Sequence, residues 1–156
     1  MKKLAVAILI VLATACSGDG GQEPEEQPDS ALRRGTAIVE TDDGAVLLRV
    51  EIADTPESRE KGLMGRENLD DDEGMVFLFF EETSGGFWMK NTLIPLSIAF
   101  FGQDGRILEI LDMEPCEEDP CPIYDPGLTY RGAVEMDRGA FDRLGIEVGD
   151  EIRVSP

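Results

Sequence analysis

The chain has 156 residues, of which 14 are Lys or Arg and 33 are Asp or Glu, and its formal net charge is −19. So acidic a composition argues against nucleic acid as a partner and against a protein face that binds anionic lipid, because both need basic surface. Histidine is absent, which excludes Ser-His-Asp and Cys-His mechanisms and removes the most common zinc ligand.

The N-terminal stretch has the pattern of an export signal. Two lysines precede an uncharged apolar run over residues 4–15, which is too short for a bilayer span of about 20 apolar residues. Ala13 and Ala15 suit ordinary signal peptidase, whereas Cys16 directly after these small residues is typical of a bacterial lipobox. We predict a signal peptide over 1–15 and a lipid on Cys16 that anchors the exported protein in the cell membrane or outer membrane, with plain secretion as the alternative.

A flexible acidic linker is expected to follow over residues 16–34. Its segment SGDGGQEPEEQPDS has almost no apolar side chain, so it cannot bury enough surface to offset the entropy of ordering. Residues 35–156 have the usual size of one globular domain, and no repeat or second domain is evident.

A β-hairpin and a helix are the first predicted elements. Strands are expected over Thr36–Thr41 and Ala45–Ala53, joined by an Asp-Asp-Gly turn, and the second strand alternates apolar and polar residues as a half-buried strand does. A helix is predicted from Asp54, with a proline near its first turn and an acid three residues on, as in a capping box. It ends near Gly62 or Gly65.

Short strands continue through the rest of the domain. A second helix is predicted over Arg138–Leu144, and a long loop with four prolines over Pro115–Gly127. Roughly eight short strands with two short helices indicate a mainly all-β fold, either a compact β-sandwich or a barrel. The later strands are expected over Met75–Phe80, Phe87–Thr92, Pro95–Phe101, Arg106–Met113, Tyr130–Met136 and Glu151–Val154.

Two further cysteines lie close together in the long loop. If Cys16 carries lipid, Cys116 and Cys121 remain as an even pair, which we expect to form a disulfide in an oxidising compartment. Their four-residue spacer differs from the C-x-x-C motif of redox-active thiols. Because the ring is small, the bond should restrict the conformation of the loop and contribute little to the stability of the whole fold.

Several motifs occur in an order that points to a known family. They occupy residues 60–66, 73–77, 87–92, 94–96, 145–146 and 148–150, and the most specific is Phe-Trp-Met-Lys-Asn-Thr. Over nearly the whole domain the chain resembles the bacterial and archaeal domain-of-unknown-function family 192. The resemblance implies a compact β fold, often exported, with no assigned activity or catalytic residues.

The tryptophan strand supplies the first candidate binding residues. Trp88 shares a predicted strand face with Lys90 and Thr92, while Asn91 lies on the other face. Such a mixture suits a ligand groove, in which the ring stacks on an apolar or sugar face and the ammonium holds an anion. The alternative is a core tryptophan with a neighbouring lysine in a cation–π contact.

Other candidates lie on neighbouring elements. Arg131 and Glu135 share a strand face and could pair with each other or with Lys90 across the sheet, as a structural bridge or as part of a site. Arg66, at a helix end, could bind anions or cap carbonyl groups. Tyr124 and Tyr130 lie in or near the long loop and are expected near the tryptophan.

No metal or cofactor is predicted. The segment 70–74 has the composition of a calcium loop but lacks the alternating spacing of the EF-hand. The sequence favours a non-catalytic extracytoplasmic module that binds a small ligand or an envelope protein. A histidine-free hydrolase using Glu135 with a second carboxylate, or a structural accessory subunit of an envelope complex, are the alternatives.

Overall fold

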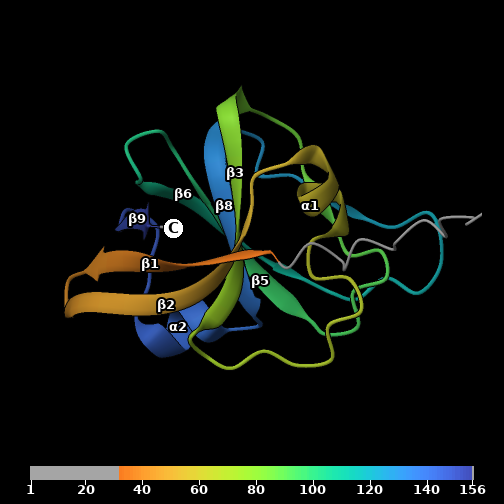
Figure 1. The fold of residues 1–156 in the computed structure, drawn as a ribbon, viewed down its shortest axis with the longest axis horizontal. Coiled ribbons are helices and arrows are strands. Elements are labelled where there is room, and N and C mark those ends of the chain that lie inside the picture. Colours follow the sequence, from red (N-terminus) through yellow and green to blue (C-terminus); the bar gives the residue numbers. More distant parts are fainter. Residues whose placement is uncertain (1–31, 156) are drawn as a thin grey trace, which may run out of the picture. The chain divides into compact units, whose positions relative to one another are not determined.

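The computed structural model describes residues 32–155. The predicted signal peptide, the lipid on Cys16 and most of the predicted linker lie outside these residues. In the described part the mainly β fold and the two short helices are confirmed (Figure 1). The elements are β1 Arg33–Thr41, β2 Gly44–Ala53, α1 Pro56–Lys61, β3 Glu73–Thr83, β4 Phe87–Trp88, β5 Leu96–Phe101, β6 Ile107–Met113, β7 Ile123–Tyr124, β8 Tyr130–Asp137, α2 Ala140–Leu144 and β9 Glu151–Ser155.

Seven strands form one mixed sheet in the order β6-β5-β8-β3-β2-β1-β9, and β4 pairs with β7 in a separate small sheet. Within the large sheet β2 and β3 are parallel, and the other neighbouring strands are antiparallel. The edge strands approach each other at a bridge between Arg106 and Glu151. The sheet is nevertheless not closed, so the barrel that the strand pattern allows does not form.

Both faces of the central strands are buried, which explains the continuous apolar runs in β3 and β5. Figure 1 shows β3 and β8 side by side near the middle of the molecule. On one face Val76 and Val134 pack with Phe141 of α2. On the other, Met75 and Ile98 belong to a second cluster that includes buried residues from the turns around α1 and β4. Strands covered on both faces carry apolar residues without alternation.

The contact between β3 and β8 is unusually close at Gly74. A Cβ atom at this position would lie 2.3 Å from the backbone oxygen of Glu135. Any larger residue would therefore push β3 away from β8 at the level of Glu135.

The helices begin later than the sequence pattern predicts. The N-cap of α1 is Thr55, whose Oγ1 accepts a hydrogen bond from the Ser58 backbone at 3.2 Å, while the Thr55 backbone donates to the Ser58 hydroxyl at 3.0 Å. This reciprocal cap satisfies two backbone groups of the first turn and displaces the predicted start at Asp54. The second helix starts after Gly139 rather than at Arg138. In the described chain no helix is long and apolar enough to cross a membrane.

Several strand boundaries also differ from prediction, and β3 spans Glu73–Thr83 rather than Met75–Phe80. β1 begins at Arg33, two residues inside the predicted linker. The strand predicted over Phe87–Thr92 ends at Trp88, because Asn91 takes a left-handed conformation with φ 58° and the Thr92 backbone donates to the Met89 carbonyl at 3.2 Å. Trp88, Lys90 and Thr92 therefore do not share a strand face.

Candidate functional site

Glu135 is a carboxylic acid buried in an apolar part of the sheet. It lies on β8 between Met75 of β3 and Ile98 of β5, which are its cross-strand partners, and its side chain is only 4 % exposed. Among the described residues no side chain or backbone group forms a hydrogen bond or ion pair with this carboxyl group. Burial raises the pKa of Glu135 to about 8, because the charged form loses its hydration.

The Glu135 side chain forms part of the lining of a small pocket of about 30 Å³, which we call the Glu135 pocket. This volume accommodates only a small polar group, on the order of one or two water molecules. The pocket lies between α1 with its following turn and the segment around β4. Its lining consists of residues 59–64 together with Phe77, Phe87, Trp88, Thr92 and Glu135. Three of the predicted site residues, from two separate segments of the chain, thus meet here: Trp88, Thr92 and Glu135.

Trp88 and Lys90 form an exposed surface next to this pocket. Trp88 is 43 % exposed, and the Lys90 ammonium lies 5.6 Å from the centroid of its ring, in a cation–π contact. Lys90 also forms an ion pair with Asp119 at 2.8 Å. Among the described residues Lys90 makes no ion pair with Glu135, which the sequence allowed as one possibility. The cross-strand partner of Trp88, Ile123, is 60 % exposed, which extends the apolar surface beside the ring.

The turn after β4 is held by backbone hydrogen bonds. The Asn91 carbonyl accepts a bond from the Gly65 backbone at 2.9 Å, and the Met89 carbonyl accepts one from Cys116 at 3.3 Å. These bonds connect the turn to the segment after α1 and to the cysteine loop. Asn91 thus positions Thr92, which is 7 % exposed, rather than lining the pocket itself.

The two tyrosines have structural partners. The Tyr130 hydroxyl donates to the Gly85 carbonyl at 3.1 Å, and its ring packs edge-on against Phe100. Burial, followed by the charge of Asp125, raises the pKa of Tyr130 to about 12. The Tyr124 hydroxyl accepts a bond from the Glu114 backbone at 2.9 Å. Neither side chain lines the Glu135 pocket.

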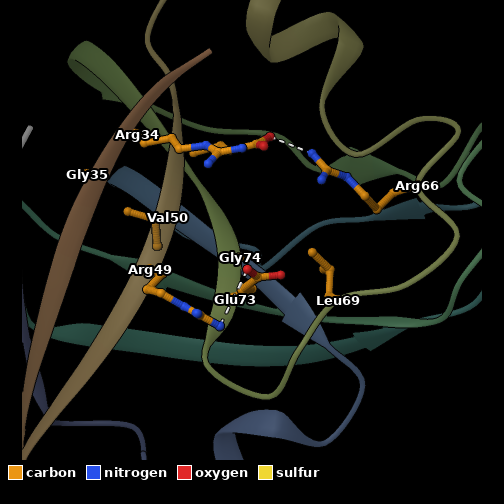
Figure 2. A pocket seen from close by; sticks show the side chains of 9 residues that line it. Arg34, Gly35, Arg49, Val50, Arg66, Leu69, Glu73 and Gly74 are labelled. Carbon is orange, nitrogen blue, oxygen red and sulfur yellow. Dashed lines mark hydrogen bonds and ion pairs between the residues drawn. The ribbon is translucent and has the colours of Figure 1, made fainter. Parts of the chain in front are cut away.

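The remaining predicted residues lie elsewhere. Arg131 is half-buried and makes no ion pair with Glu135 in the described structure. Arg66 forms an ion pair with Glu51 at 2.6 Å at the edge of a second, larger pocket of about 210 Å³ (Figure 2). Arg34 and Arg49 also line this pocket, and the sequence reasoning missed both. Their positions beside Glu51 depend on strand pairing, which local patterns do not reveal.

The carboxylate groups of the acidic segment 70–72 form ion pairs with arginines. The Arg49 guanidinium contacts Asp72 at 2.7 Å and Asp70 at 3.4 Å, and Arg143 contacts Asp71 at 2.6 Å. Within residues 32–155 no group of acidic and cysteine residues is arranged to hold a metal ion. Cys116 and Cys121 are joined in a disulfide, with their Cα atoms 5.7 Å apart, as the sequence predicts.

The Glu135 pocket combines two chemical properties. A protonated carboxyl group both donates and accepts a hydrogen bond, and the exposed tryptophan ring beside it offers a flat apolar face. In chemical terms, these two properties suit a neutral polar group at the carboxyl and an apolar group on the ring.

Comparisons with known proteins agree with the fold. The model of the DUF192 family, described as Uncharacterized ACR, matches residues 37–154. The chain is similar to a candidate transcription regulator from Sinorhizobium meliloti 1021, with a TM-score of 0.75 and 32 % identity over 81 % of this chain and 98 % of that one. It is also similar to a protein of unknown function from Novosphingobium aromaticivorans DSM 12444, with a TM-score of 0.74 and 32 % identity over 90 % of this chain and 99 % of that one. A search of the curated proteins found no match. The family match covers most of the chain, and the similarity to the two solved structures extends over almost the whole length of each of them. The family resemblance that the motifs indicate is confirmed. The chain belongs to the DUF192 family.

Proposed function

We propose that the chain is an exported, lipid-anchored, non-catalytic module that binds a small neutral ligand at the Glu135 pocket and on the adjacent Trp88 ring. The observation that carries the proposal is the buried Glu135 carboxyl group, which faces a pocket and has no hydrogen-bonding partner among the described residues. Among the described residues no side-chain oxygen is both fully buried and without a hydrogen-bonding partner, so the Glu135 carboxyl group reaches the water of the pocket. A ligand that enters the pocket would replace this water and supply hydrogen bonds to the carboxyl group.

The pocket size indicates how such a ligand would bind. About 30 Å³ admits a hydroxyl or amide group but not a whole molecule. Trp88, 43 % exposed at the pocket, provides the surface for the rest of the ligand. A sugar fits this chemistry, because one hydroxyl group would reach Glu135 while the apolar face of the ring stacks on the indole.

Two features support the exported location. Lys2 and Lys3 are followed by an apolar run and a cysteine after small residues, the pattern of a bacterial lipoprotein. The Cys116–Cys121 disulfide is a bond that persists in an oxidising compartment and is rare in the cytosol.

A hydrolase is a second candidate, and one observation favours it. The exposed residue Glu60 lines the same pocket as Glu135, and Glu135 has the raised pKa of a general acid. Turnover of a glycoside, abolished by both Glu60→Gln and Glu135→Gln, would establish catalysis and overturn the non-catalytic proposal.

Thermal shift tests ligand binding on the purified chain with a panel of neutral sugars and small amides. A ligand of the folded state raises the melting temperature. We expect at least one sugar to do so for the wild type but not for Glu135→Met, which fills the space of the carboxyl group with an apolar chain. Trp88→Ala should also abolish the shift.

The matched control is Phe80→Ala, which removes an aromatic ring that is 90 % exposed and does not line the pocket. This variant should retain the sugar response. An equal loss in Phe80→Ala and Trp88→Ala would show non-specific adsorption to exposed rings. No response to any ligand, combined with capture of an envelope protein dependent on Trp88 and Ile123, would favour the accessory-subunit alternative.

A further inference from the structure

The larger pocket gathers positive side chains on a strongly acidic protein. Arg34, Arg49 and Arg66 line it, although the whole chain has only 14 Lys and Arg against 33 Asp and Glu. Arg34 comes from β1, Arg49 from β2 and Arg66 from the loop after α1. Figure 2 shows Arg34 and Arg66 extending toward the same end of the pocket from opposite sides. We call this space the arginine pocket.

Two of the three guanidinium groups are fixed by acids. Glu51 contacts Arg66 at 2.6 Å, and the side chain of this glutamate is only 20 % exposed. Asp72 and Glu73 contact Arg49 at 2.7 and 3.4 Å. These contacts orient the two guanidinium groups and neutralise much of their charge.

Arg34 is different from its two neighbours. It lies directly opposite Glu51 in the pairing of β1 with β2, yet its side chain forms no hydrogen bond or ion pair with any described residue. Its guanidinium therefore presents unused donors to the pocket. Planar, bidentate recognition by arginine suits a carboxylate in particular.

The charges around the pocket limit the ligand to a single negative charge. The lining acids are Glu51 and Glu73, and Asp70 and Asp72 also contact Arg49, so the acids beside the pocket outnumber its three arginines. The only one of the three arginines without an acidic partner among the described residues is Arg34. A doubly charged anion would meet the two glutamates at close range. Leu69 adds apolar surface to the lining, which favours an organic body over an inorganic ion.

We propose that the arginine pocket is a second binding site, specific for a small organic monocarboxylate whose carboxylate is bound by Arg34 next to the oriented Arg66. The volume of about 210 Å³ suits a small acid rather than a nucleotide or a lipid. The arginine pocket and the Glu135 pocket have no lining residue in common. The inference is therefore independent of the proposed function.

Isothermal titration of the purified full-length chain at low salt tests the site. The probes are benzoate, 3-methylbutanoate and pyruvate, with benzamide as an uncharged analogue of benzoate and inorganic phosphate as a competing anion. We expect at least one of the monocarboxylates to bind, and benzamide and phosphate not to bind. Arg34→Gln should weaken binding by at least about tenfold.

Arg33→Gln is the matched control, because it makes the same change in net charge one residue away. Arg33 pairs with Asp54 and does not line the pocket. This variant should bind within about twofold of the wild type. The proposal is overturned if none of the monocarboxylates binds, if phosphate binds as well as they do, or if the two variants lose affinity equally. The last result would reflect overall charge rather than a built site.

Discussion

Glu135 places an ionisable group between two buried apolar side chains, Met75 and Ile98. Burial raises its pKa from 4.5 to about 8, whereas the unfolded chain keeps the ordinary value. Between these values the folded state retains a proton that the unfolded state has released. Stability must therefore fall as the pH rises through this window, by up to about 1.4 kcal/mol per pH unit, and level off above pH 8.

Glu135→Gln keeps the shape of the side chain and removes its ionisation. We expect this variant to be more stable than the wild type at pH 8, and to lose the part of the pH dependence between pH 5 and 8 that Glu135 causes. Urea unfolding at several pH values measures both effects. Glu82→Gln, at an exposed position, is the control and should follow the wild type. Parallel curves for all three proteins would mean that Glu135 titrates normally.

Lys90 illustrates how a candidate site residue can also be an ordinary surface residue. Its side chain is 37 % exposed, it pairs with Asp119, and it lies over the Trp88 ring. Because exposed ion pairs contribute little, Lys90→Ala should lower stability by less than about 1 kcal/mol, and Asp119→Ala by a similar amount. Thermal denaturation checks this prediction. A loss of several kcal/mol would show that Lys90 is part of the scaffold.

At the scale of elements, the disulfide closes a small ring in the segment that packs beside β4. Closing a loop of this size stabilises by about 2 kcal/mol on entropic grounds, well below the stability of a typical domain. The double variant Cys116→Ser, Cys121→Ser should therefore remain folded, while proteases cut first within residues 115–127. Limited proteolysis with mass mapping tests this expectation. Global unfolding at room temperature would contradict it, because the loop would then be essential to the fold.

Elements that depend on local signals were predictable from the sequence. The hairpin around Gly44, the apolar run of β3 and the helix stop at Gly145 each follow from a turn residue or a periodicity that lies within a few positions. The end of β4 could not be predicted from the sequence, because nothing in Phe-Trp-Met-Lys-Asn-Thr indicates that Asn91 takes a left-handed conformation. β7 was missed because its two residues form a strand only through their pairing with β4.

The same distinction applies to the candidate sites. Trp88 and Thr92 were predicted from their unusual mixture of side chains, and Glu135 from its charge within a strand. That Glu135 is buried beneath α1 depends on the register of β8 with β3 and β5, which local sequence does not determine. Arg34 was not predicted for the same reason, because its place in the arginine pocket depends on its position opposite Glu51 in the pairing of β1 with β2.

At the scale of the whole molecule, we predict that the mature protein begins at Cys16 and carries acyl chains. The short apolar run followed by small residues and a cysteine is the basis of this prediction. Mass spectrometry of the N-terminal peptide from the membrane fraction should show lipid on the cysteine, and Cys16→Ser should release the processed protein from the membrane. An unmodified N-terminus would contradict the prediction.

The central claim is that the Glu135 carboxyl group is buried, protonated near neutral pH and available to a ligand. The most direct measurement is a pH titration of its carboxyl resonance by ¹³C NMR, with the signal assigned by its absence in Glu135→Gln. We predict a midpoint near 8 in the free protein, and a displaced resonance when a sugar from the thermal-shift panel is bound. A midpoint near 4.5, or a resonance that a bound ligand leaves unmoved, would contradict it.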